Sequence, residues 1–179
     1  MPLNNISKMN YLGGNFMQSN LLAKRLVLPA LLIALNVAIA RIFIIPVPMT
    51  HGNINLCDAG IFIAALLYGR RTGLFVGAFS GFLLDLISGY AQYMFFSLIV
   101  HGLEGFVVGW IGYQAVRKLQ LTALLVGGLI VISGYFITDT LLYSLTPGLV
   151  GIPTNAVQVL TGAFIALPLA IKLRQPLKL

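Results

Sequence analysis

Residues 57–89 read CDAGIFIAALLYGRRTGLFVGAFSGFLLDLISG, two apolar runs separated by the arginine pair Arg70-Arg71. A helix needs about 20 apolar residues to cross the hydrocarbon core of a bilayer. The second run approaches that length. The first is shorter, so we expect a helix there that is tilted or partly buried among its neighbours. Similar apolar runs alternate with short polar or basic connections along the rest of the chain.

The composition agrees with a protein dissolved in lipid. Of the 179 residues, 59% are hydrophobic and only 8% are charged, which is too little polar surface for a water-soluble domain of this size. We therefore predict an all-α membrane protein built as one six-transmembrane-helix bundle. The apolar segments lie at about 26–45, 57–69, 73–89, 92–115, 121–145 and 156–171. We expect a polar tail over 1–22, the membrane domain over 23–174 and a short cytoplasmic tail over 175–179.

The basic residues predict an orientation. Ten of the eleven Lys and Arg lie at the N-terminus, in the second and fourth connections, and at the C-terminus. The positive-inside rule places both termini and these two connections in the cytoplasm. Arg41 is the exception, near the outer end of the first helix, and it could neutralise one of the aspartates. The net charge of +7 does not indicate nucleic-acid binding, because the basic residues come as pairs between apolar runs.

Small residues recur at four-residue spacing in three segments. Such a row lies on one helix face and lets two backbones approach closely. We interpret the glycine rows as packing inside the bundle, whereas the alanine row of the first helix could equally face a partner protein. The rows are Ala30, Ala34 and Ala38; Gly73, Gly77 and Gly81; and Gly105 and Gly109.

All four acidic residues fall inside or at the edges of apolar segments, where an unpaired charge costs at least about 3 kcal/mol. In the predicted topology Asp58, Asp85 and Asp139 lie toward the outer side. Converging buried polar groups in an apolar bundle are typical of a small-molecule site. His101 and Glu104 are three residues apart on one helix face near mid-membrane, and they could contact a ligand, carry a proton or form a buried pair.

Further polar side chains point to the same region. Tyr135, Asp139 and Tyr143 follow one another at four-residue steps, a stripe suited to a flat heterocycle, although Tyr143 could belong to the interfacial aromatic belt. The first outer connection, residues 46–56, contains two prolines and many hydrogen-bonding side chains, and we interpret it as a lid, with an ordinary exposed loop as the alternative. The predicted ligand contacts are His51, Asn53, Asn55, Asp85, His101, Glu104, Tyr135, Asp139 and Asn155.

The sequence gives little support for an enzymatic function. The chain lacks the phosphate-binding Gly-x-x-x-x-Gly-Lys-Ser/Thr pattern and so cannot hydrolyse ATP by itself. Ser80 with His101 partly resembles the pair of intramembrane rhomboid proteases, but Ala78 replaces the glycine of that motif. Cys57 has no second cysteine for a disulfide and no Cys or His at metal-ligand spacing. We expect no enzymatic activity, no cofactor and no metal site.

The order of several motifs resembles the S components of energy-coupling factor (ECF) transporters. The motifs are Ala34-Leu35-Asn36-Val37-Ala38, the lid loop, the run from Asn53 to Gly60 with the turn Tyr68-Gly69-Arg70-Arg71, and the run from Gly77 to Leu86. The resemblance covers about residues 26–172. The segments from Asp85 to Tyr90 and from His101 to Gly105 are similar to the hydroxymethylpyrimidine-type members of that family.

The resemblance implies a multi-pass subunit in a bacterial plasma membrane that captures a vitamin precursor, here hydroxymethylpyrimidine, under its first outer loop. It also implies partners: the membrane scaffold EcfT, contacted through the alanine row of the first helix, and two ATPase subunits. Pyridoxine, pantothenate or another vitamin stays open as the ligand. A self-sufficient carrier or small channel is the alternative of another class, and the absence of a second half-repeat argues against it.

Overall fold

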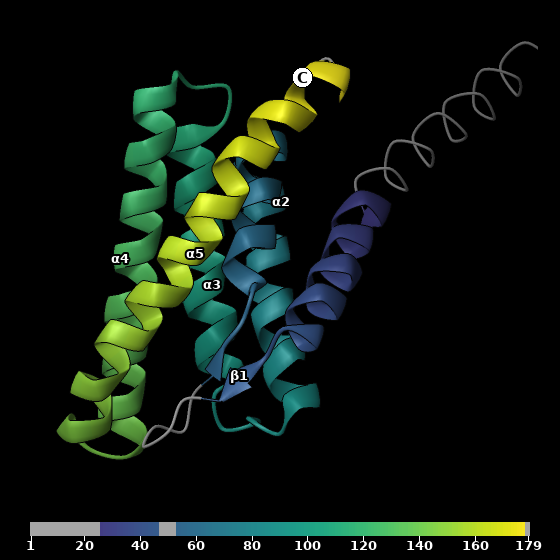
Figure 1. Cartoon of the computed structure of the whole chain (residues 1–179). Coiled ribbons are helices and arrows are strands. Elements are labelled where there is room, and N and C mark those ends of the chain that lie inside the picture. The colour runs from purple at the N-terminus through teal and green to yellow at the C-terminus, as the bar shows by residue number, and fades with distance from the viewer. Residues whose placement is uncertain (1–25, 47–52, 178–179) are drawn as a thin grey trace, which may run out of the picture.

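The computed structural model describes the backbone of residues 26–46 and 53–177. Within these residues, five helical elements and one short hairpin pack together (Figure 1). The predicted N-terminal tail and the predicted contact His51 lie outside the described residues. The elements are an N-terminal helix, Leu26–Ile42; β1, Ile45–Pro46; β2, Asn53–Ile54; α2, Cys57–Ser88; α3, Met94–Gly112; α4, Arg117–Leu142; and α5, Leu145–Leu177.

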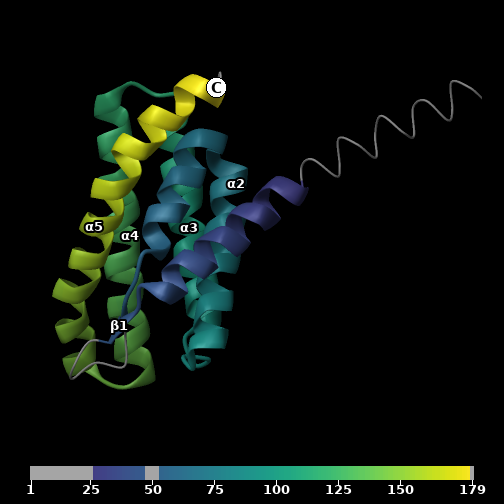
Figure 2. The same ribbon diagram turned by 45° about the vertical axis from the view of Figure 1, so that its right-hand side comes forward.

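Helix α2 consists of two arms, residues 57–68 and 70–88, that meet at Gly69. Gly69 has φ 82° and ψ −175°, a left-handed conformation that glycine adopts readily. Asp58 in the first arm lies 3.4 Å from His101, and a Cβ placed on Gly81 in the second arm would lie 2.6 Å from the same imidazole. A straight helix would separate residues 58 and 81 by about 35 Å. The chain therefore turns back at Gly69, and the arms lie side by side (Figure 1, Figure 2).

The second arm of α2 packs on α3 through glycine. A Cβ on Gly73 would lie 2.2 Å from the carbonyl oxygen of Gly105, and a Cβ on Gly77 would lie 2.0 Å from that of His101. Next to the turn, a Cβ on Gly109 would lie 2.6 Å from the backbone nitrogen of Arg70. No side chain larger than hydrogen fits at such distances. The prediction that the glycine rows are internal packing surfaces is confirmed.

Helices α2, α3, α4 and α5 are long and apolar enough to cross a membrane, and the N-terminal helix is apolar but shorter. Their shared core includes Phe62, Val108, Val131 and Val159. Many large apolar side chains point outward instead, such as Phe164 at 83% exposure. Outward apolar surface of this extent is expected where lipid is the solvent. The helical membrane-protein class predicted from the sequence is confirmed.

The N-terminal helix contacts the bundle along one side and leans away from it at its N-terminal end (Figure 1, Figure 2). Asn36 is buried on that side, and its amide donates a hydrogen bond of 3.1 Å to the carbonyl oxygen of Cys57. Ala40 joins a small cluster with Cys57 and Ile61. The predicted partner-docking residues, Ala30, Ala34 and Ala38, are all exposed. Within the described residues, this alanine row is therefore not an internal packing surface.

Two sequence predictions were wrong in detail. Residues 146–155, predicted as a connection, are helical, because α5 begins at Leu145. Pro147 lies in its first turn, where a missing N–H breaks no helical hydrogen bond. Arg41 is exposed, and the ion pairs that the structure places among the described residues do not include it. The strands β1 and β2, which pair Ile45 with Ile54, add a short hairpin to an otherwise helical fold.

Candidate ligand-binding site

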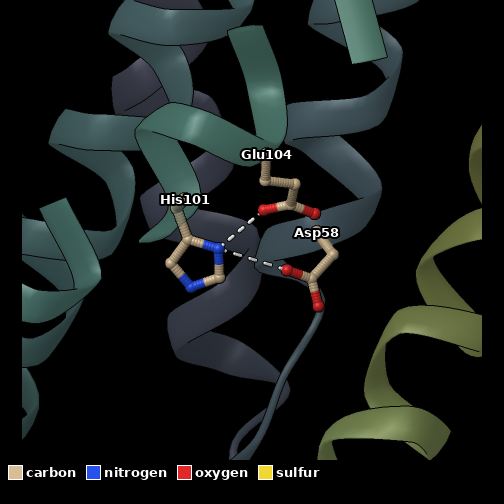
Figure 3. Close-up of side chains that lie close together, drawn as sticks. All are labelled: Asp58, His101 and Glu104. Atoms are coloured by element: carbon tan, nitrogen blue, oxygen red, sulfur yellow. Dashed lines mark hydrogen bonds and ion pairs between the residues drawn. The ribbon is translucent and has the colours of Figure 1, made fainter. Parts of the chain in front are cut away.

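A cavity lies between the hairpin and helices α2 to α5. Seven of the nine predicted contacts line it: Asn53, Asn55, Asp85, His101, Tyr135, Asp139 and Asn155. The other lining residues are Gly81, Leu84, Tyr90, Tyr93, Gly151, Thr154 and Gln158. Residues predicted from separate segments therefore do converge on one polar space. Glu104 does not line the cavity, but it contacts His101, which does (Figure 3).

A chain of hydrogen bonds runs along one wall of the cavity. The hydroxyl of Ser97 donates to Asp85 Oδ2 and lies 2.6 Å from the hydroxyl of Tyr135. The Tyr135 hydroxyl is in turn 3.1 Å from Nε2 of His101. These bonds join the second arm of α2, α3 and α4. They hold the Tyr135 and His101 rings edge to face, with centroids 5.6 Å apart, so this wall is preorganised for a ligand.

His101 also joins the cavity wall to a buried acid pair. Its Nδ1 lies 2.7 Å from Glu104 Oε2 and 3.4 Å from Asp58 Oδ1. Asp58 comes from the start of α2, whereas Glu104 is one helical turn from His101 on α3 (Figure 3). Both carboxyl groups are fully buried, and His101 is nearly so. The predicted proximity of His101 and Glu104 is present, with Asp58 as an additional member of the cluster.

Asp139 lies one helical turn after Tyr135 on α4 and lines the same cavity. The hydroxyl of Tyr93, just before α3, donates a hydrogen bond of 2.6 Å to Asp139 Oδ1. Burial, with the hydrogen bond to the Asp139 carboxyl, raises the pKa of Tyr93 well above its usual value, so the phenol stays protonated and remains a donor. The Tyr93 ring lies between those of Tyr135 and Tyr143, with centroids 6.4 and 6.2 Å away. Asp139 is thus positioned within a group of aromatic rings.

The hairpin supplies the rim of the cavity through Asn53 and Asn55. The Asn55 amide donates to Asn53 Oδ1 at 2.8 Å, and Asn55 Oδ1 accepts from the backbone N–H of Cys57, also at 2.8 Å. The backbone N–H of Asn55 donates to Gln158 Oε1 of α5 at 2.9 Å. The rim is thereby attached to the start of α2 and to α5.

Sequence reasoning missed several residues of this region. Ser97 precedes His101 by four residues and Gln158 follows Asn155 by three, so helical spacing alone could have found both. Tyr93 precedes Ser97 by four residues, so the same spacing could have found it. Asp58 was recognised as a buried acid but not as a neighbour of His101, because that contact depends on the reversal at Gly69.

The cavity has an acidic character. Its described lining contains Asp85 and Asp139, the imidazole of His101 and several amides and phenols, and it contains no Lys or Arg. Groups of this kind accept hydrogen bonds from N–H and O–H donors and disfavour an anion. The arrangement is therefore suited to a small neutral or cationic molecule with several donors and one flat face.

Comparison with known proteins gives two kinds of match. Residues 20–175 match the family described as "ECF-type riboflavin transporter, S component". The thiamine precursor transporter HmpT of Lactococcus lactis subsp. cremoris (strain MG1363) is 40% identical over 144 residues, which are 80% of this chain and 83% of that protein. An uncharacterized protein of Pyrococcus woesei, described by its place in the gap 3′ region, is 32% identical over 123 residues, 68% of this chain and 82% of that protein.

Proposed function

Because this chain belongs to the S components of ECF-type transporters, we propose that it captures hydroxymethylpyrimidine from outside the cell for import as a thiamine precursor. The observation that carries the choice of ligand is the acidic cavity, in a chain 40% identical to a thiamine precursor transporter. In this proposal the cavity residues act by binding, with no chemical step.

The chemistry of an aminopyrimidine suits the lining. Its amino and hydroxymethyl groups donate hydrogen bonds, which the carboxylates of Asp85 and Asp139 accept. Its ring nitrogens accept, and the amides of Asn53 and Asn155 donate to them. The flat ring stacks on or packs edge-on against Tyr135. A small, mostly aromatic ligand held by a few aimed polar groups is the usual design of such a site.

The alternative ligands differ in charge and size. Pantothenate carries a carboxylate, which two aspartates repel and which no Lys or Arg of the described lining neutralises. Riboflavin, named in the family description, carries three fused rings and a sugar-alcohol chain. Pyridoxine, a single neutral ring with hydroxyl donors, is the nearest competitor.

Calorimetric titration of the purified chain with hydroxymethylpyrimidine, pyridoxine, thiamine, riboflavin, pantothenate and folate tests the proposal. We expect the first to bind most tightly and pantothenate not at all. Tighter binding of riboflavin or pantothenate would overturn the choice of ligand and leave the family assignment intact.

We further propose six membrane spans, with the two arms of α2 counted separately and the N-terminal helix as the first. Supporting this, Arg174 near the end of α5 donates a hydrogen bond of 3.1 Å to the carbonyl oxygen of Leu66, so the basic C-terminal end lies beside the Gly69 turn. The hairpin lies at the other end of the bundle (Figure 1). Both termini and the Arg70-Arg71 turn would then be cytoplasmic.

Reporter tags test this topology. Tags at either terminus or at the Arg70-Arg71 turn should report cytoplasm, and a tag near Pro147 should report the outside. An external signal from the Arg70-Arg71 turn would exclude six spans.

The exposed alanine row supports docking to the scaffold EcfT, which two ATPase subunits would drive in a bacterial plasma membrane. Ala30, Ala34 and Ala38 present a smooth face on which a partner helix can pack closely, while Asn36 holds the other side of this helix to the bundle. A self-sufficient carrier would need no such partner. Uptake by cells that lack the partner ATPases distinguishes the two, and we expect it to be abolished.

A further inference from the structure

The cluster of Asp58, His101 and Glu104 lies mostly behind the cavity, and ligand capture leaves it unexplained. Its relative exposures are 0%, 4% and 0%, and of the three only His101 reaches the cavity lining. Two carboxyl groups and one imidazole thus share a buried space inside a membrane protein (Figure 3). Carboxyl groups in such a place are protonated, paired with a positive charge or bound to an ion.

The hydrogen bonds of the cavity wall fix one side of the imidazole. An ionised Asp85 can only accept, so the Ser97 hydroxyl donates to it. The Tyr135 hydroxyl then donates to Ser97, and it accepts from the N–H at Nε2 of His101. In a neutral imidazole the other nitrogen, Nδ1, carries a lone pair. That lone pair faces Glu104 Oε2 at 2.7 Å and Asp58 Oδ1 at 3.4 Å, so a proton or a metal ion must lie between them.

The oxygen atoms of the acid pair favour the metal ion over the proton. Asp58 Oδ1, Asp58 Oδ2 and Glu104 Oε1 are buried and make no hydrogen bond of ordinary geometry within the described residues, while Gln158 and Glu104 lie close to the Asp58 carboxyl. The ion pairs that the described residues offer these two acids are those with His101. A proton between His101 and Glu104 serves only Oε2 and leaves both Asp58 oxygens unsatisfied. One divalent cation balances both carboxylates and uses an oxygen of each.

We propose that Asp58, His101 and Glu104 bind one divalent transition-metal ion of the zinc class. The candidate ligand atoms lie within 4.8 Å of one another. Tetrahedral zinc holds ligand atoms about 3.3 Å apart. The Nδ1 to Asp58 Oδ1 distance of 3.4 Å matches this, and the 2.7 Å contact with Glu104 widens by about half an ångström on binding.

The surroundings favour a transition metal over calcium or magnesium. Ca²⁺ and Mg²⁺ prefer oxygen ligands only, whereas an imidazole nitrogen with two carboxylates suits zinc, cobalt or manganese. The Nε2–H bond to Tyr135 is the kind of outer hydrogen bond that orients a metal-bound histidine. The ion would tie the start of α2 to the middle of α3 and fix the histidine ring at the cavity wall.

Metal analysis of the full chain tests the site. The protein is purified in detergent without chelators and with a streptavidin-binding tag, because a polyhistidine tag binds metal itself. Elemental analysis should find about one equivalent of a transition metal. After chelator treatment, added Co²⁺ should restore one equivalent and give visible absorption of a four- or five-coordinate cobalt centre.

Two near-isosteric variants assign the ligands. Asp58→Asn and Glu104→Gln should each lose the cobalt absorption while the protein stays monodisperse in gel filtration. Asp139→Asn is the matched control, since it removes a buried carboxylate that is not in the cluster, and it should keep one equivalent of metal. If the wild-type chain contains no metal and takes up no Co²⁺ at about 0.1 mM, protons balance the cluster and the proposal fails. Unchanged cobalt absorption in Glu104→Gln would also overturn it.

Discussion

Two rows of small residues with the same four-residue spacing have opposite surroundings in this molecule. Gly73 and Gly77 lie against the backbone of α3, closer than any Cβ allows. Ala34 and Ala38 face outward from the N-terminal helix and touch no element of the described bundle closely enough to be buried. The spacing of small residues therefore predicts a face for close helix packing, but it does not say whether the partner belongs to the same chain.

Asn36, which lies between Ala34 and Ala38, shows which side of the N-terminal helix faces the bundle. Asn36 lies two residues after Ala34, hence on the opposite side of the helix, and it is the side chain that binds the bundle. A polar residue buried in a membrane protein needs a partner, so its direction shows which side of the helix is internal.

The largest effect is expected where a glycine row is interrupted. Gly77→Val places a branched side chain where even a Cβ would be 2.0 Å from the carbonyl oxygen of His101, and backbone cannot move aside as a flexible side chain can. We expect loss of folded protein, measured as recovery of a monodisperse peak in gel filtration. Ala34→Val is the matched control and should fold normally. Normal recovery of Gly77→Val would show that the second arm of α2 and α3 are not locked at this contact.

Substitutions in the alanine row should leave folding intact and impair docking instead. Ala34→Trp and Ala38→Val should fold and bind ligand as the wild type does, yet abolish uptake and co-purification with the scaffold, since bulk on this face prevents close approach of a partner helix. Uptake assays, pull-downs and calorimetry on the same preparations separate the three properties. Persistent uptake in both variants would mean that this face has no partner.

A smaller effect is expected from substitutions in the cavity, which the second arm of α2 and α3 help to line. Asp139→Asn and Asp85→Asn each weaken an acceptor in a desolvated site, which typically costs about 1–3 kcal/mol, or roughly 5- to 150-fold in affinity. Docking to the scaffold should be unchanged in these variants, whereas the alanine variants should lose docking and keep ligand binding. Asn155→Gln changes only the length of another side chain that lines the cavity. Unchanged affinity in both aspartate variants, measured by calorimetry, would make these acids structural.

The smallest effect is expected at Arg41, on the same helix as the alanine row. Because Arg41 is exposed and makes no ion pair in the described part of the chain, Arg41→Ala should change stability by no more than about 0.5 kcal/mol. Thermal unfolding in detergent and expression yield measure this. A loss beyond 1 kcal/mol, by the same reasoning about surface substitutions, would restore the interpretation that Arg41 neutralises an acid.

Hydropathy predicted most helices well because lipid imposes long apolar runs. It placed a break at Arg70-Arg71, next to the actual turn at Gly69. It failed at the start of α5, where Pro147, Gly148 and Gly151 resemble a loop. Proline is tolerated in a first helical turn, and Gly148 packs tightly against Thr140 of α4, so both were misleading as loop signals.

The polar site was predictable where helical spacing aligns side chains and unpredictable where the chain reverses. Tyr135 and Asp139 share a face of one helix, and both line the cavity. Asp58 meets His101 only because the Gly69 turn brings the first arm of α2 back onto α3. Tyr93, which donates to Asp139, was missed although it lies in the predicted segment 92–115, four residues before Ser97. Contacts across a turn depend on tertiary geometry, which a single sequence does not encode by spacing.

The short connection from the N-terminal helix to the hairpin couples the position of this helix to that of the hairpin. The outer part of the helix carries Ala30 and Ala34, the Asn36 bond to Cys57 holds it to the bundle, and its C-terminal end continues through Ile44 into β1. Strand β1 is clamped to β2, which bears Asn53 at the mouth of the cavity. A force that a partner applied to the outer part of this helix would reach the mouth of the cavity through Ile44 and the pairing of β1 with β2.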